Sequence, residues 1–126
     1  MTPKSLLSAE IDAFEQMIAD LQAIAARADS GRRSELVVLR KRLSDQIVRM
    51  RDIGVRVFTD GAGSTIVDDF RSRLSTVLHL VAMHQASWPA VGIDENSADY
   101  SRSADNVAQA NRAFIAWTRA AMVTIA

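Results

Sequence analysis

Apolar residues recur along this chain at alternating steps of three and four, which is the spacing of the buried stripe of an amphipathic helix. The first stripe consists of Leu7, Ile11, Phe14, Ile18, Leu21 and Ala25. Similar stripes occupy three further stretches, and glycine or proline residues separate all four. We therefore predict helices over about residues 3–28, 33–58, 65–88 and 97–125.

Four predicted helices of similar length, joined by short links, are typical of an antiparallel up-and-down four-helix bundle. No stretch shows strand-like alternation of comparable quality. We therefore predict an all-α fold in which residues 1–126 form a single domain, with Phe14, Leu43, Val77 and Phe114 in its core. The alternative is a set of long helical hairpins, whose apolar stripes become covered when two chains dimerise.

The link between the third and fourth predicted helices is unusually apolar, with the sequence Trp88-Pro89-Ala90-Val91-Gly92-Ile93. Because Val91 and Ile93 alternate, an extended strap would point both side chains the same way. We expect this strap to cover one end of the bundle. The alternative is that Val91 and Ile93 belong to a docking surface for a partner protein.

The composition disfavours several classes of function. The chain has no cysteine, which rules out disulfides, iron–sulfur clusters and thiol catalysis. Its 15 basic and 15 acidic residues give no net charge, which disfavours nucleic acid and anionic membranes as partners of the whole molecule. No apolar run reaches the ~18–20 residues of a membrane span, and none follows the N-terminus as in a signal peptide. We expect a protein of the bacterial cytoplasm.

His84 and Trp88 lie four residues apart on the apolar stripe of the third predicted helix. The simpler interpretation is a core histidine that packs against the indole. The alternative is a small-molecule pocket near His84, Trp88 and Trp117. We predict neither a metal nor a cofactor, because His79 and His84 are about 140° apart around a helix and no Glu-x-x-His motif is present for a di-iron centre.

Arg73 and His79 stand in a spacing that resembles the Arg-x(4–6)-His motif of HEPN domains, which are small helical ribonucleases. The resemblance covers these two residues. It implies that His79 acts as general base or acid and that Arg73 stabilises the charge of a phosphorane. Two features weigh against it. The two side chains are about 240° apart on a continuous helix, and Leu74 follows the arginine where that family usually has a polar residue.

Three arginines of the second predicted helix, Arg42, Arg49 and Arg56, are spaced seven residues apart. Each precedes a residue of the apolar stripe by one position, so they form an arginine ridge along the edge of the buried face. Acidic residues of the first predicted helix are available as ion-pair partners: Asp12, Glu15 and Asp20. We expect the ridge to be paired or solvated, and the alternatives are contact with a partner protein or with phosphate groups.

No set of residues predicts a reaction, and we therefore expect a protein that is not an enzyme. The first hypothesis is a helical protein-interaction module, such as an adaptor, an assembly factor or a chaperone-like bundle, that binds a protein partner or forms a homodimer. The alternatives are binding of a small molecule near His84 and Trp88, and nucleic-acid binding or RNA cleavage through Arg73 and His79.

Overall fold

The computed structural model describes residues 2–125, and the elements in this range are four long helices and one short helix. They are α1 (Pro3–Ala26), α2 (Arg32–Gly61), α3 (Ser64–Ser87), the 3-10 helix η1 (Ala90–Gly92) and α4 (Ser97–Val123). No strand occurs between residues 2 and 125. The prediction of an all-α four-helix bundle is confirmed, and each predicted helix end lies within three residues of the observed one.

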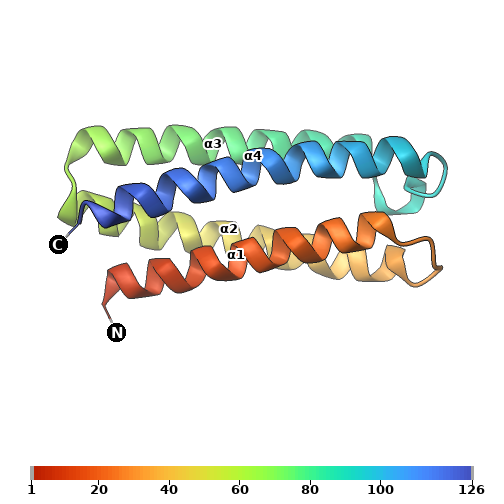
Figure 1. Cartoon of the computed structure of the whole chain (residues 1–126), viewed down its shortest axis with the longest axis horizontal. Helices are drawn as coiled ribbons and strands as arrows, with labels where there is room; N and C mark the ends of the chain where they lie inside the picture. The colour runs from red at the N-terminus through yellow and green to blue at the C-terminus, as the bar shows by residue number, and fades with distance from the viewer. Residues whose placement is uncertain (1, 126) are drawn as a thin grey trace.

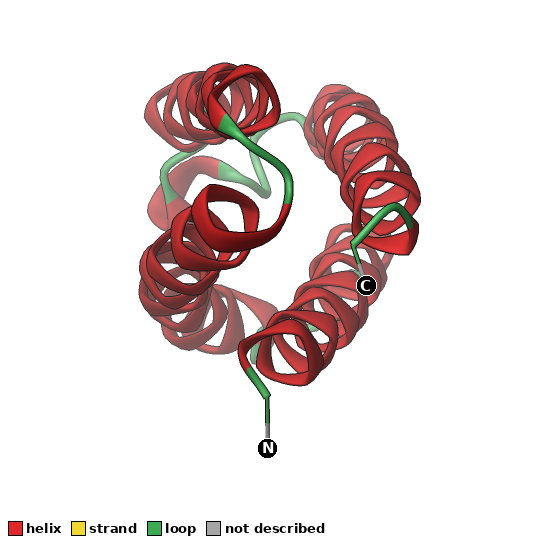
Figure 2. Ribbon diagram, turned by 90° about the vertical axis from the view of Figure 1, so that its left-hand side faces the viewer, coloured by secondary structure: helices red, strands yellow, loops and turns green. Residues whose placement is uncertain are grey.

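The four long helices run alternately in opposite directions and enclose a common core (Figure 1). α1 packs against α2 and α4, and α3 packs against the same two helices from the other side. The view along the bundle shows the resulting closed ring (Figure 2). One chain covers its own apolar stripes, so the fold does not require the dimerised hairpins considered above.

The middle of the core consists of residues that the stripe pattern predicts to be buried. Phe14, Leu43, Val77 and Phe114 are 0–4% exposed. The ring of Phe114 packs against Phe14 and Phe70, with centroid distances of 6.4 and 5.8 Å. These large side chains bring α1, α3 and α4 together at one level of the bundle.

The buried residues form two clusters at different levels of the bundle. The larger cluster contains the phenylalanines and extends toward the end that carries the turn between α2 and α3. The smaller cluster lies toward the opposite end and consists of Ile24, Ala25, Leu36, Ile93 and Tyr100. A cavity with polar side chains in its wall borders both clusters.

The link after α3 covers the end of the bundle with one side chain rather than two. Ile93 is fully buried, whereas Val91 is 79% exposed. Residues 90–92 form a turn of 3-10 helix, in which side chains two positions apart diverge instead of pointing the same way as in an extended strap. The expectation that both side chains point the same way is therefore wrong.

Arg32, the first residue of α2, holds this link against the bundle. The residue is 1% exposed, and its guanidinium lies 5.6 Å from the ring centroid of Tyr100. It donates to the carboxylate of Asp94 at 2.6 and 3.0 Å and to Oγ of Ser97 at 3.0 Å. It also donates to the backbone carbonyl of Arg27. One buried cation therefore ties together the end of α1, the start of α2 and the start of α4.

Candidate functional site

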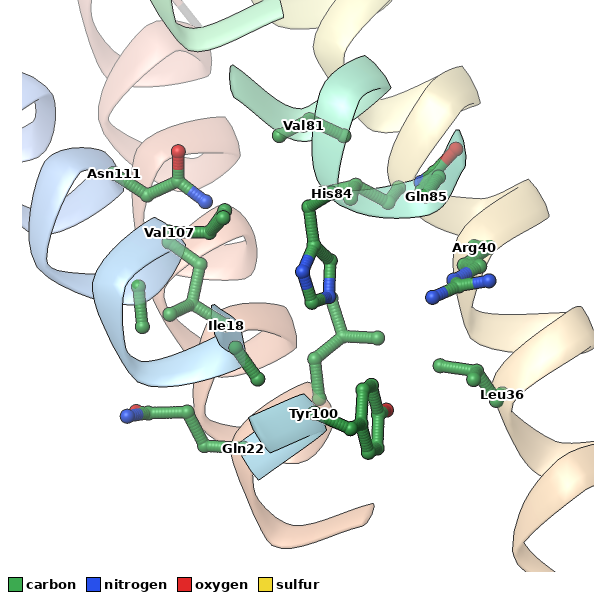
Figure 3. Close-up of a pocket in the computed structure, with 14 residues that line it drawn as sticks. Ile18, Gln22, Leu36, Arg40, Val81, His84, Gln85, Tyr100, Val107 and Asn111 are labelled. Atoms are coloured by element: carbon green, nitrogen blue, oxygen red, sulfur yellow. The ribbon is translucent and has the colours of Figure 1, made fainter. Parts of the chain in front are cut away.

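A cavity of about 40 Å³, partly open to solvent, lies between the two apolar clusters, with side chains from all four long helices in its wall (Figure 3). This volume holds about three water molecules. Most of the wall is apolar. The polar side chains that line it are Gln22, Arg40, His84, Gln85, Tyr100 and Asn111.

Two of these polar residues reach the interior because they occupy stripe positions of their helices. Arg40 lies four residues after Leu36 and three before Leu43, which is the spacing of buried residues on α2. Asn111 lies four residues after Val107 on the corresponding face of α4. Helical geometry therefore aims both side chains at the bundle axis.

Asn111 has a buried amide with an unsatisfied oxygen. The residue is 3% exposed, and its Oδ1 has no hydrogen-bond partner among residues 2–125. A buried polar group without a partner costs about 1–3 kcal/mol. Figure 3 shows the amide at the wall of the space that His84 enters. The amide is thus available to a molecule in the cavity.

Arg40 brings a guanidinium without a counterion to the same space. Its Nη2 is buried without a partner, and the described part of the chain provides no hydrogen bond or ion pair for this side chain. Burial lowers the pKa of Arg40, although an arginine remains protonated in proteins. None of the described residues that line the cavity is an aspartate or glutamate. The cavity therefore carries an uncompensated positive charge.

His84 projects from α3 into the middle of the cavity (Figure 3). Its Nδ1 lies 2.7 Å from Oγ of Ser103, and its ring stacks on that of Tyr100 at a centroid distance of 5.9 Å. Burial lowers the pKa of His84 to about 4, and the charge of Arg40 adds to this effect. The imidazole is therefore neutral near pH 7. Its Nε2 forms no hydrogen bond within residues 2–125.

Tyr100 and Trp88 form the end of the site that faces the smaller cluster. Tyr100 is 1% exposed, and burial raises the pKa of its hydroxyl, against the opposing effect of Arg40 and Arg32. Trp88 packs against this residue, with a centroid distance of 5.9 Å between the two rings. Trp88 does not line the cavity, so it supports the wall through Tyr100.

Trp117 lies in a different part of the core. It packs against Phe58 at a centroid distance of 6.2 Å, and the guanidinium of Arg73 lies 4.8 Å from its ring centroid. These contacts place Trp117 beside the larger cluster. The structure therefore brings His84 and Trp88 to one tyrosine and leaves Trp117 apart from them.

Arg73 and His79 both lie on α3, and both are exposed. Arg73 donates to Asp69 at 3.1 Å and covers the ring of Trp117. Because α3 is continuous through both positions, the six-residue separation turns the side chains about 240° apart. The structure does not bring together the pair whose spacing resembles the HEPN motif.

Comparison of the chain with family models, with curated proteins and with solved structures found no match. Evidence for function therefore comes from the side chains of this chain alone. Within residues 2–125, no three histidine or carboxylate side chains gather closely enough to hold a metal ion. The helices of this range also lack a stretch that is long and apolar enough to cross a membrane.

The arginine ridge of α2 is only partly paired. Arg49 lies 3.6 Å from Oε1 of Glu10 and donates to the side chain of Gln46 at 3.1 Å. Arg42 and Arg56 are exposed and form no ion pair within the described residues. Two of the three arginines therefore remain accessible from solvent.

Two of the expected acidic partners of the ridge pair with α4 instead. Arg119 of α4 binds Asp12 at 2.8 Å and Glu15 at 2.9 Å. The hydrogen bond and the charge of Arg119 lower the pKa of Glu15. The expectation that Asp12 and Glu15 pair with the ridge is wrong, because both lie on the side of α1 that faces α4. The third expected partner, Asp20, lines the same groove between α1 and α2 as Arg42 of the ridge, but no ion pair joins the two.

This groove has a volume of about 470 Å³ and includes Arg42 of the ridge. Apolar side chains contribute much of its lining, and charged residues surround them. The lining residues are Asp20, Ala23, Ile24, Arg27, Ser34, Glu35, Val38, Leu39 and Arg42. Val38 and its neighbour Val37 are 51% and 58% exposed. An apolar surface beside an accessible arginine is thus available to another protein.

Sequence reasoning missed Arg40 and Asn111, although a signal for both was present. Each is a polar residue at a position where the stripe spacing calls for an apolar one. Their apolar neighbours Leu39 and Ala110 fit the stripe approximately and therefore hide the interruption. A charged or amide side chain on the buried face of a helix is the feature that marks the cavity.

Proposed function

We propose that this protein is a non-enzymatic binding protein whose small-molecule ligand occupies the interior cavity. One observation carries the proposal: Nη2 of Arg40 and the amide oxygen of Asn111 are both buried without partners, and both side chains line the same cavity. Buried polar groups in proteins are nearly always hydrogen-bonded. A ligand that bonds to either group removes part of this deficit when it binds.

Water alone is a poor occupant of this space. Water satisfies a buried amide well, but it does not neutralise the charge of Arg40. The cavity has the general composition of a ligand site, with mostly apolar walls and a few converging polar groups. It is much smaller than the roughly 300–1,000 Å³ of a site for a drug-sized molecule. The ligand therefore has only a few non-hydrogen atoms.

The geometry argues against catalysis by the pair of Ser103 and His84. A hydrogen bond from serine to histidine is the arrangement that activates a serine nucleophile. A histidine whose pKa is about 4, however, is a weak base near neutral pH. No carboxylate among the described lining residues is placed to orient or charge this imidazole. The pair is better suited to presenting Nε2 of His84 to a bound molecule.

The proposal is tested by screening small polar compounds against the isotope-labelled protein and mapping the amide shifts by NMR. A ligand of the cavity is expected to shift Val81, Tyr100 and Asn111, which come from α3 and α4 on two sides of the space. It is also expected to raise the melting temperature in proportion to the logarithm of its concentration. A screen in which no compound shifts these residues would contradict the proposal.

A pair of matched variants separates cavity binding from surface binding. Ala104→Val adds two methyl groups to the cavity wall from α4, so it should lower the affinity of a ligand in the cavity by about tenfold or more. Ala116→Val makes the same change at an exposed position of the same helix and should leave affinity unchanged. Equal affinity in the two variants would place the ligand outside the cavity.

Homodimerisation through the groove between α1 and α2 is a second candidate function. It is favoured by the exposure of Val38, which lines this groove and is 51% exposed. The groove carries both an acidic residue, Asp20, and a basic one, Arg42, so a second copy can pair opposite charges across a two-fold axis. Sedimentation equilibrium should show a dimer that Val38→Glu dissociates. A monomer at high micromolar concentration would contradict the homodimer.

A further inference from the structure

We infer that the ligand of the interior cavity is a small monovalent anion whose charge is carried by oxygen atoms in one plane, such as formate, acetate or nitrate. The juxtaposition behind this inference is the guanidinium of Arg40 and the imidazole of His84 at one space, which both side chains enter in Figure 3, with Asn111 on the far side of His84. The inference rests on the proposed function and adds the charge, shape and size of the ligand.

Charge decides the class of ligand. Arg40 is the one permanently charged side chain among the described residues of the cavity wall, and no carboxylate lies beside it. A cationic ligand would be repelled, and a neutral one would leave the guanidinium without a counterion. An anion forms a charge-assisted hydrogen bond and neutralises the site at the same time.

Arg32 is a buried arginine of the same helix whose partners all come from the chain itself. Its guanidinium binds Asp94 at 2.6 Å and donates to Oγ of Ser97 at 3.0 Å. Arg40 lies two turns further along α2, also points inward, and has none of these partners within residues 2–125. Arg40 is less deeply buried than Arg32, and none of the described residues supplies its counterion, so an anion from solution is the remaining source.

The arrangement of donors suits a flat oxyanion. The planar guanidinium presents parallel N–H groups that match two oxygens of a carboxylate or nitrate. If Oγ of Ser103 donates to Nδ1 of His84, the imidazole proton lies on Nε2, which can donate to the ligand. The unpartnered oxygen of Asn111 needs a donor, which a carboxylate or nitrate lacks, so Asn111 adds nothing to the binding of the anion.

Size limits the ligand to a few atoms. The cavity of about 40 Å³ corresponds to about three water molecules. Formate, acetate and nitrate have three or four non-hydrogen atoms and displace a similar number of waters. Nucleotides, sugar phosphates and haem are too large for this space. A small anion also leaves the apolar walls from Ile18 and Val81 in contact with its edges.

The inference is tested by isothermal titration at pH 7 in a zwitterionic, chloride-free buffer. Acetate and acetamide have nearly the same shape and differ in charge, so they form the central comparison. Acetate, formate and nitrate are expected to bind. The affinity for acetamide should be lower than that for acetate by about tenfold or more, and ammonium should show no binding. Acetamide that binds as tightly as acetate, or no anion that binds up to about 50 mM, would overturn the inference.

Matched variants assign the binding to Arg40. Arg40→Met should abolish acetate binding, whereas Arg40→Lys should retain part of it because the charge remains. Arg56→Met removes an exposed arginine of the same helix and should bind acetate like the wild type. Acetate affinity that survives Arg40→Met would overturn the inference. If the NMR screen finds neutral ligands in the cavity but no anion binds, the inference of an anion is overturned and the proposed function stands. If no compound enters the cavity, the proposed function is contradicted as well.

Discussion

Gly54 of α2 lies directly against the ring of Phe70 of α3. A Cβ atom at position 54 would be 2.3 Å from Cζ of Phe70, a distance that side chains do not tolerate. Phe70 is fully buried and packs against Phe58 and Phe114, so its ring cannot move away easily. The absence of a side chain at position 54 therefore sets how closely α2 and α3 approach.

Gly54→Ala is expected to destabilise the protein by about 1–2 kcal/mol. Alanine gains about 1 kcal/mol of helix propensity over glycine, but overpacking of the Phe70 ring costs more than that gain. Urea unfolding followed by circular dichroism measures the difference. Gly92→Ala is the control, because its Cβ would meet its nearest neighbour, Cγ of Pro89, at 3.8 Å. A Gly54→Ala protein as stable as the wild type would refute the steric argument.

Arg32→Met is expected to cost about 3–5 kcal/mol, because the carbonyls and the carboxylate around the buried guanidinium lose their donor. Arg33→Met supplies the control at the neighbouring position. Arg33 also reaches Asp94, at 3.2 Å, but its side chain is 48% exposed, so its loss should cost under about 1 kcal/mol. The measurement is chemical unfolding of both variants. Similar losses in the two would show that burial of Arg32 is unimportant.

Arg40→Met is expected to stabilise the ligand-free protein by about 1 kcal/mol. The substitution replaces a partly buried cation without a counterion by an apolar side chain of similar length. Thermal unfolding in anion-poor buffer measures the effect, with Arg56→Met as the exposed control. A clear loss of stability in Arg40→Met would mean that Arg40 has partners in the folded chain, and the site would need another explanation.

Stability is expected to decrease as the pH falls from about 6.5 to about 4 because of His84. Its pKa drops from 6.5 to about 4 on folding, so within this window the unfolded chain binds a proton that the folded chain does not. The full shift corresponds to about 3 kcal/mol, and partial solvent exposure of the ring reduces our expectation to about 1–2 kcal/mol. The titratable groups that face it are Arg40 from α2 and Tyr100 from α4.

The pH effect is measured by urea unfolding at several pH values, and the readout is the difference between variants because carboxylates titrate in the same range. His84→Gln should flatten the loss of stability between pH 6.5 and pH 4. His79→Gln changes the exposed histidine of the same helix and should follow the wild type. Parallel curves for the wild type and His84→Gln would show that His84 is not held neutral by the fold.

The fold was predictable because it depends on a local property, the period of the apolar residues. Stripes such as the one from Leu7 to Ala25 indicate where each helix lies and which face is buried, and short links leave an antiparallel bundle as the natural arrangement. The direction of Val91 was not predictable in this way. A single 3-10 turn after Pro89 reverses it, and no periodicity extends over so short a segment.

The site could be predicted only in part, because it depends on which buried polar groups lack partners in three dimensions. His84 and Trp88 stand out in the sequence as a histidine and an indole on a buried face. Arg32 and Arg40, by contrast, look alike in the sequence, yet Arg32 meets Asp94 from a distant link while Arg40 meets a cavity. That difference arises from the packing of four helices, so the sequence near each arginine does not reveal it.

The polar layer between the two apolar clusters also bears on how the helices are aligned along the bundle. If α2 slid by one heptad, Arg40 would enter the level that Ile47 occupies within the larger cluster, where a guanidinium would be surrounded by hydrocarbon. Polar residues in helical bundles enforce one alignment at a cost in stability. Arg40 therefore lowers the stability of the ligand-free bundle, but it lowers the stability of a shifted alignment by more. An apolar replacement of Arg40 should raise the melting temperature of the bundle. Its NMR spectrum should contain more than one set of signals, because the helices adopt more than one alignment.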